Sequence, residues 1–165
     1  MKLNLLLSSD DILGGFINLD EYPIIKNKDQ AFTTEKKKGS VRNLDHIADT
    51  GEVEQIVAND VIDFIDPDKK GGVIQGWCKK LAYGGTISIG GVDLWEVSKG
   101  YSGFGLSDEQ VSSLLFGNPG FPFGYRRGVC NGQNIRDILQ NCGLKVTRHM
   151  VDNYRYNITA KRPEL

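Results

Sequence analysis

Short, almost continuous apolar runs recur along the chain and are separated by polar or helix-patterned segments. The clearest runs are residues 3–7, 16–20, 53–58 and 86–89. Continuous rather than alternating hydrophobicity is typical of strands that are buried on both faces of a parallel sheet. Strands that alternate with helical connections form a sheet with helices packed on it. The pattern therefore predicts an α/β fold, a Rossmann-like three-layer sandwich with a mostly parallel, twisted sheet.

The helix signals are local. Residues 71–82 carry apolar side chains at i, i+4, i+5 and i+8, which places them on one helical face. Ser107 and Gln110 have capping-box spacing and predict a helix that ends near residue 116. Asn131 is expected to cap a further helix, which Gly143 ends.

The remaining segments are expected to be strands and connections. Residues 144–151 and 155–160 predict two strands that meet at Asp152-Asn153, so the sheet ends in an antiparallel hairpin. Residues 40–44 predict a weak strand, and residues 98–107 a loop. The three lysines at 36–38 are expected in a connection, as a solvated surface.

The length and composition limit the function classes. At 165 residues the chain is expected to form one domain, residues 1–165. Its net charge of -1 gives no reason to expect nucleic-acid binding. No run of about 18 apolar residues is present, so no membrane span is expected. Cys78, Cys130 and Cys142 form no Cys-x-x-Cys pair, which predicts neither a metal site nor a disulfide framework. Reduced thiols would suit a cytoplasmic protein.

Several motifs, in order, resemble one family. Leu3-Asn4-Leu5 and the stretch from Gly14 to Asp20 are similar to its first strand, loop and second strand. Residues 60–64 and 77–86 are similar to the turn after its fourth strand and to the tryptophan-to-Gly-Gly segment before its fifth. The chain resembles the class I S-adenosylmethionine-dependent methyltransferases, in particular a branch of small proteins associated with polysaccharide modification and phages.

The resemblance implies a cofactor, S-adenosylmethionine, and residues that would bind it. Asp20 stands where the family has an acid that binds the ribose hydroxyls, although a turn acid is the alternative. Ser40 or Asn43 would meet the adenine. Asp10 and Asp11 would hold the methionine amino group, or cap a short helix instead. The complete set placed at the cofactor is Leu6, Ser8, Asp10, Asp20, Ser40, Asn43, Leu44, Asn59 and Asp60.

The chain also departs from the family pattern. The glycines of the first loop are missing, and Leu6 stands where the backbone would approach the cofactor. The link over residues 8–15 has room for about one helical turn, which predicts a thinly covered sheet face. Asp63-Phe64 replaces a glutamate-histidine pair, so no general base is predicted there. Methyl transfer from a sulfonium depends chiefly on alignment of nucleophile and methyl group.

The acceptor side is expected in the loop from Gly117 to Cys130, which would face the acceptor as a lid. Tyr125 and Arg126, followed by Arg127, suggest substrate binding to an anionic or sugar-phosphate group. Surface arginines that pair with nearby acids are the alternative. The acceptor would be a small or glycan-like molecule.

Three functions remain open. The first is a methyltransferase. The second is a catalytically inactive binding or scaffold protein that keeps the fold, which the lost glycines and Phe64 favour. The third is a nucleotide-binding dehydrogenase, which the absence of Gly-x-Gly-x-x-Gly after the first strand disfavours. The sequence leaves the oligomeric state open.

Overall fold

The computed structural model describes residues 1–7, 11–22, 36–117 and 124–164. Its strands are β1 (Lys2–Leu6), β2 (Ile17–Asp20), β3 (Lys36–Lys38), β4 (Val53–Asn59), β5 (Leu81–Val92), β6 (Lys145–Asp152) and β7 (Arg155–Lys161). Its helices are α1 (Lys70–Lys80), α2 (Leu94–Ser102), α3 (Asp108–Phe116) and α4 (Gly132–Asn141), and η1 (Ile62–Phe64) is a single 3-10 turn.

The strands form one seven-stranded sheet in the order β3-β2-β1-β4-β5-β7-β6. The strands β1 to β5 run parallel to one another. The last strand, β7, pairs antiparallel with both β5 and β6. The predicted fold class, Rossmann-like with a mostly parallel sheet and a C-terminal antiparallel hairpin, is confirmed.

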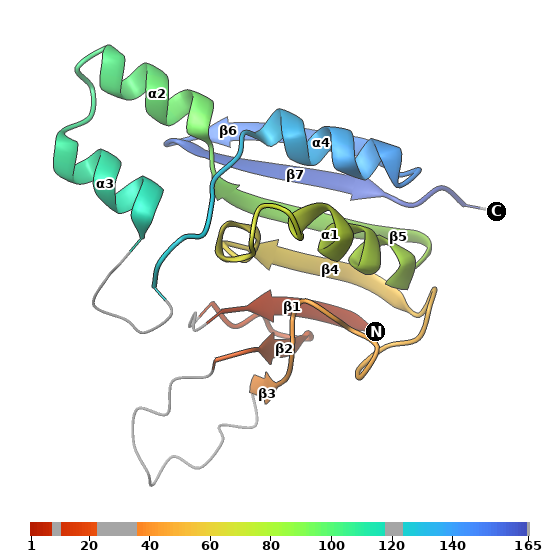
Figure 1. Cartoon of the computed structure of the whole chain (residues 1–165). Coiled ribbons are helices and arrows are strands. Elements are labelled where there is room, and N and C mark those ends of the chain that lie inside the picture. Colours follow the sequence, from red (N-terminus) through yellow and green to blue (C-terminus); the bar gives the residue numbers. More distant parts are fainter. Residues whose placement is uncertain (8–10, 23–35, 118–123, 165) are drawn as a thin grey trace, which may run out of the picture.

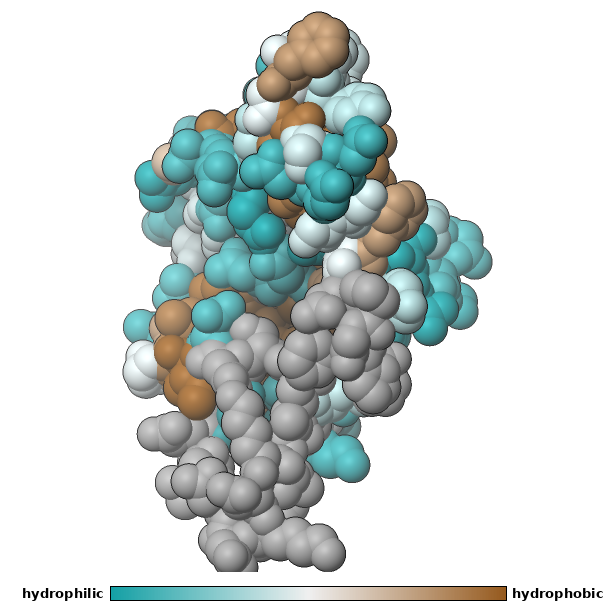
Figure 2. All heavy atoms as spheres, turned by 90° about the vertical axis from the view of Figure 1, so that its left-hand side faces the viewer, coloured by the Kyte–Doolittle hydropathy of each residue, from teal (hydrophilic) through white to brown (hydrophobic). Residues whose placement is uncertain are grey.

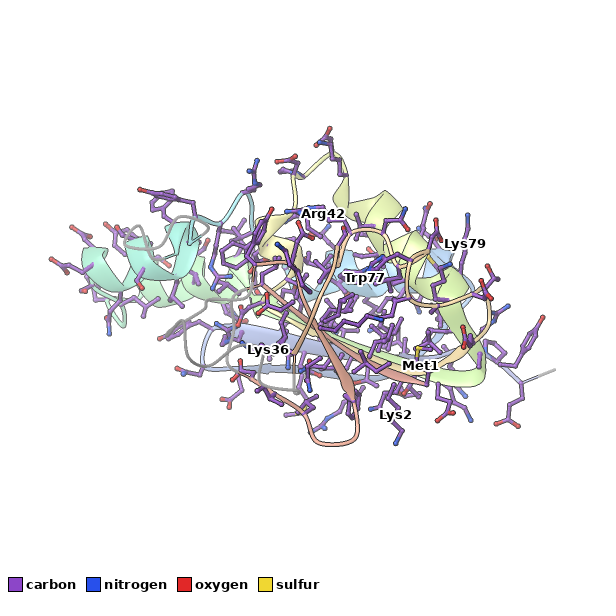
Figure 3. All side chains as sticks on the ribbon, turned by 90° about the horizontal axis from the view of Figure 1, so that it is seen from below. Met1, Lys2, Lys36, Arg42, Trp77 and Lys79 are labelled. Atoms are coloured by element: carbon purple, nitrogen blue, oxygen red, sulfur yellow. The ribbon has the colours of Figure 1, made fainter. Side chains whose placement is uncertain are left out.

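Helices α1 and α4 pack side by side on one face of this sheet, and α2 and α3 extend beyond its edge (Figure 1). The main core lies between α1, α4 and the sheet. Trp77 of α1 is fully buried there, and its Nε1 donates a hydrogen bond to the Val41 carbonyl oxygen at 2.8 Å. Figure 3 shows Trp77 on the helix side and Lys2 pointing away on the other side.

The opposite face carries polar side chains that bond to one another. Ser88 of β5 donates to Asn157 Oδ1 of β7 at 3.1 Å. Nearer the other edge, Asn4 Nδ2 donates to Asn18 Oδ1 at 2.8 Å and to the Asp11 carbonyl oxygen at 2.7 Å. The described part of the β1–β2 link contains no helix. Asn4 and Asn18 are nevertheless only 3% and 4% exposed, so the expected thin cover is not seen at these two residues.

The third strand is Lys36–Lys38, and the prediction of a strand at residues 40–44 is wrong. Lys36 pairs with Asn18 of β2, so the lysines are the edge strand of the sheet. Val41 and Leu44 instead belong to the core. Their hydrophobicity reflects packing under α1 rather than strand pairing. Lysines on an edge strand also discourage pairing with other chains.

The bounds of two further elements, α2 and β5, differ from the prediction. Helix α2 occupies part of the expected loop, and it begins because Asp93 caps it by accepting from the Glu96 N–H at 3.0 Å. Strand β5 starts at Leu81, which pairs with Val53 of β4, and it continues through Gly90 to Val92 because β7 pairs with it from Thr86 to Val92.

Other local signals are confirmed. The capping box at Ser107 and Gln110 starts α3, and Asn131 caps α4. The hairpin turn is centred one residue later than expected. Asn153 and Tyr154 both have positive φ, 47° and 63°, which is the geometry of a tight two-residue turn.

Within the described ranges, no helix is long and apolar enough to cross a membrane.

Candidate functional site

The carboxyl ends of the parallel strands meet at one edge of the sheet, on the left of Figure 1 and facing the viewer in Figure 2. Ligands of open α/β sheets bind at this edge. The strand register places Asp20, Leu6, Asn59 and Gly90 in one row across the ends of β2, β1, β4 and β5. Among the coloured residues, Figure 2 shows mostly hydrophilic side chains on this end, with hydrophobic ones in separate patches between them.

Asp20, the expected ribose ligand, is fully buried. Its Oδ1 accepts a hydrogen bond from the Tyr22 backbone N–H at 3.0 Å. Its Oδ2 lies 3.5 Å from Lys36 Nζ, and the Lys36 side chain is 14% exposed. The acid therefore ends β2 as predicted, but it already has an ammonium neighbour from β3.

The expected residues of the first loop are only partly described. Leu6 is buried, with 2% exposure. Ser8 and Asp10 lie outside the described residues. Asp11, which follows them, is exposed at the rim of the pocket described below.

The expected adenine-side residues lie in the turn after β3. Ser40 is exposed, and its Oγ accepts from the Arg42 N–H at 3.2 Å. Asn43 is exposed and accepts from the Asp45 N–H at 2.8 Å. Leu44 instead packs in the core. Both hydrogen bonds lie within this turn. Ser40 and Asn43 are therefore surface residues that stabilise the turn near β2.

A pocket of about 370 Å³ opens at the ends of β4 and β5. One wall comes from the β6–β7 hairpin, and another from the loop after β1. Its lining residues are Asp11, Asn59, Asp60, Gly90, Gly91, Met150, Asp152, Arg155, Tyr156 and Asn157. Of the residues predicted from the sequence, Asn59 and Asp60 are here. The hairpin residues were missed, because only the turn between their strands has a local sequence signal.

Asp60 is held in an unusual conformation at the pocket wall. Its φ is 55°, which is uncommon for a residue other than glycine and marks local strain. Arg126 Nη1 lies 3.3 Å from its Oδ1, and Arg155 forms an ion pair with its Oδ2. Two arginines from distant segments thus fix the carboxylate at the end of β4.

Asp63 lies behind this wall and is fully buried. Its Oδ2 is 2.7 Å from Arg126 Nη1 and accepts from the Val92 N–H at 3.1 Å. Burial raises the pKa of the Asp63 carboxyl, against the opposing effects of the Val92 N–H and of Arg126. Arg126 also lies 5.2 Å above the Phe64 ring. Asp63, which stands where the family has a glutamate, is therefore buried inside the protein.

The residues that were expected to bind an anionic acceptor do not form an open anion site. The Arg126 side chain is 10% exposed and faces Asp60 and Asp63. Arg127 Nη1 pairs with Asp66 at 2.8 Å. The structure thus shows the alternative reading, arginines paired with nearby acids. Tyr125 is exposed, and neither it nor Arg126 is among the described residues that line the pocket.

The thiols and possible metal ligands show no second site. Cys78, Cys130 and Cys142 are free cysteines. Burial raises the pKa of the Cys130 thiol, which lies 3.7 Å from Tyr156 Oη. Among the residues that the structure places, no three His, Cys, Asp or Glu side chains are grouped to hold a metal ion.

No protein-family model matches the chain, and no curated protein does. Solved structures do match. The PH0226 protein of Pyrococcus horikoshii aligns with a TM-score of 0.62 at 15% identity, covering 98% of this chain and 81% of that one. A S-adenosylmethionine-dependent methyltransferase from Methanosarcina mazei aligns with a TM-score of 0.56 at 12% identity, covering 79% and 68%.

A third structure is the Burkholderia thailandensis 1,6-didemethyltoxoflavin-N1-methyltransferase, solved with bound 1,6-didemethyltoxoflavin and S-adenosylhomocysteine. Its TM-score is 0.53 at 13% identity, with 79% of this chain and 51% of that one covered. The chain spans about a third, 36%, of an O-methyltransferase family protein from the same organism. At such identities the likeness concerns the fold alone. The protein therefore has the class I fold of the S-adenosylmethionine-dependent methyltransferases.

Proposed function

We propose that the protein is a S-adenosylmethionine-dependent methyltransferase that acts on a small or glycan-like acceptor. The observation that carries this proposal is the row of Asp20, Leu6 and Asn59 across adjacent strand ends. The row leads directly into the pocket at Asn59 and Asp60. A nucleoside held at Asp20 would thus point its reactive end toward a cavity that has room for a second molecule.

The residues present fit the cofactor best at its ribose and least at the first loop. The Asp20 carboxylate can accept hydrogen bonds from two ribose hydroxyls once Lys36 shares or leaves it. Ser40 and Asn43 would face the adenine, and Leu44 would support their turn from the core. Asn59 and Asp60 would border the methionine end, and Leu6 would contribute its main chain. Ser8 and Asp10 remain proposed contacts of the amino acid portion.

The bound cofactor would supply a methyl group on a sulfonium. This chain's own residues would then align the acceptor, because alignment is the main requirement of such a transfer. Asp60 is suited to orient an acceptor hydroxyl or amine, since Arg126 and Arg155 fix its carboxylate at the pocket wall. Tyr125, which precedes Arg126 and is exposed, stays a proposed acceptor contact. The free cysteines support a cytoplasmic location.

A second candidate is a binding or scaffold protein that keeps the fold without catalysis. The burial of Asp20 and its ion pair with Lys36 favour it, because the ribose position is then filled by a side chain. Leu6 favours it as well, since a bulky residue replaces the small ones that allow close approach.

Calorimetric titration with S-adenosylhomocysteine distinguishes the two candidates. The methyltransferase proposal predicts saturable binding at or below about 1 mM. Asp20→Asn should weaken that binding about tenfold, because an amide accepts fewer hydroxyl hydrogen bonds than a carboxylate. The exposed Asp68→Asn variant is the matched control and should bind like the wild type. The absence of heat with the wild type would instead support the scaffold candidate.

A further inference from the structure

The two edges of the sheet are built differently. At one edge, β3 is short and consists of three lysines, which discourage pairing with another chain. At the other edge, β6 is eight residues long and pairs only with β7 among the described strands (Figure 1). We propose that β6 is the interface of a homodimer, in which residues 148–152 of two copies pair antiparallel about a two-fold axis at Met150. This interface is independent of the proposed function.

The backbone of β6 offers hydrogen-bonding groups at this edge. A two-residue turn closes on a hydrogen-bonded pair, here Asp152 and Arg155, and such pairs alternate with non-hydrogen-bonded pairs along an antiparallel ladder. Because Met150 is two residues from Asp152, its N–H and C=O groups face β7. The N–H and C=O groups of His149 and Val151 therefore face the open edge, where a second strand can pair with them.

The charged side chains of the strand favour an antiparallel copy of itself as the partner. Arg148 and Asp152 are exposed, carry opposite charges and form no ion pair within the described part of the chain. In a register that places Met150 opposite its own copy, Arg148 of each chain stands opposite Asp152 of the other. This is a non-hydrogen-bonded pair in that register, in which side chains approach most closely. The dimer therefore pairs four charges that the single chain leaves unpaired.

The neighbouring registers are less favourable. A symmetric pair of antiparallel strands has one residue on the two-fold axis, because residues that stand opposite each other must point to the same face. With Arg148 on the axis, two guanidinium groups would face each other. With His149 or Val151 there, Arg148 and Asp152 are no longer directly opposite. The Met150 register also buries apolar surface, since Met150 is 41% and Val151 43% exposed in the single chain.

The proposed pairing stops at two copies. A two-fold axis at Met150 uses the open edge of both β6 strands, so the assembly is closed. The lysines of β3 make the remaining edges unsuited to further pairing. Met150 and Asp152 also line the pocket, so Arg148 of the second copy would border the rim of the pocket.

Sedimentation equilibrium of the full chain tests the dimer. The wild type should dimerise with a dissociation constant of about 10–100 µM, which is typical of a small interface, and should form no larger species. Arg148→Glu places acids opposite each other and should weaken the dimer about tenfold or more. Lys145→Glu makes the same charge change on the same strand outside the paired segment and should leave the dissociation constant unchanged. A wild type that remains monomeric at about 1 mM, or forms larger assemblies, would overturn the proposal.

A charge exchange separates pairing from any structural effect of a substitution. Asp152→Lys should weaken self-association as Arg148→Glu does, because cations then stand opposite each other. Mixed in equal amounts, the two variants should form a heterodimer about as tight as the wild-type dimer, because one ion pair is restored as it was and the other with its charges reversed. If the mixture associates no better than each variant alone, the pairing of Arg148 with Asp152 is wrong.

A cross-link at the axis tests the register. Met150→Cys brings two thiols opposite each other in a non-hydrogen-bonded pair, in which the Cα atoms are close enough for a disulfide. Oxidised glutathione should therefore join two chains of Met150→Cys covalently. Thr147→Cys on the same strand, and the wild type with its native cysteines, should remain single chains under the same treatment. Cross-linking of Thr147→Cys or of the wild type to the same extent would contradict the register.

Discussion

Lys36 Nζ lies 3.5 Å from Asp20 Oδ2, so a lysine of the edge strand faces the acid that ends the neighbouring strand. The two residues belong to β3 and β2, and both lie at the carboxyl edge where a ribose would bind. The ammonium therefore competes with ribose hydroxyls for the same carboxylate oxygen.

Replacing this lysine is expected to strengthen cofactor binding. In Lys36→Met the carboxylate of Asp20 loses its ammonium neighbour, so one competitor of the ribose hydroxyls for its oxygens is removed. The affinity for S-adenosylhomocysteine, measured by calorimetry, should rise about threefold to tenfold. Lys37→Met, an exposed neighbour on the same strand, is the control. Equal or weaker binding by Lys36→Met would show that the lysine does not compete.

Trp77 should be among the most sensitive core positions. Trp77→Ala leaves a large cavity between α1 and the sheet and should lower the free energy of unfolding by about 3–5 kcal/mol. Trp77→Phe keeps most of the volume but leaves the Val41 carbonyl without its donor, at a cost of about 1–3 kcal/mol. Urea denaturation measures both. A wild-type midpoint for Trp77→Ala would contradict the burial of this side chain.

Gly76 offers a stabilising substitution in the middle of α1. A Cβ built on Gly76 meets no atom within 4 Å, and the backbone there is helical. Gly76→Ala should therefore raise the free energy of unfolding by about 0.5–1 kcal/mol, because alanine loses less conformational freedom in a helix. The melting temperature reports the gain. A lower melting temperature would contradict the open space around this position.

Asp63 predicts a dependence of stability on pH. Because burial raises its pKa, the folded state keeps the proton to higher pH than the unfolded state, whose value is near 3.8. The contribution of Asp63 to the free energy of unfolding therefore falls as the pH rises from that value through the raised pKa. The difference in unfolding free energy between wild type and Asp63→Asn should fall with pH, measured by urea denaturation upward from about pH 4.

Asp66 provides the opposite case as a control. Lys69 and Arg127 lower the pKa of its carboxyl, so its contribution is present above 3.8 and is lost only below that value. The wild type and Asp66→Asn should therefore differ by a constant amount above about pH 4. Parallel pH profiles for the two variants would contradict the assignment of the slope to Asp63.

The parts of the fold that the sequence predicts are those with local physical signals. The buried strands have continuous apolar runs, the helices have caps at Ser107 and Asn131, and Asp20 ends an apolar run. These signals depend on neighbouring residues and so survive without knowledge of the tertiary structure. The parallel direction of most strands then follows from their alternation with helical connections, whereas the order of the strands was not predicted.

The parts that the sequence does not reveal depend on distant partners. Three lysines have little strand propensity, and Lys36–Lys38 is a strand only because β2 pairs with it. Arg126 is directed inward by Asp63, more than 60 positions away along the chain. The β6–β7 hairpin forms a wall of the pocket beside Asn59, but its residues are far from Asn59 in the sequence, so no local pattern indicates that they meet. The cap of α2 is an exception, because it depends on two residues close together in the sequence. The spacing of Asp93 and Glu96 could have indicated this helix start.

The two-residue turn at Asn153 and Tyr154 governs more than the end of the sheet. It fixes which residues of β6 and β7 stand opposite each other, and alternate residues of a strand point to opposite faces. Lengthening the loop by one residue would exchange Met150 and Asp152 for their neighbours at the cavity. A change in the length of this loop would therefore change which side chains face the pocket, and so which ligand fits, without a substitution at any residue that lines it.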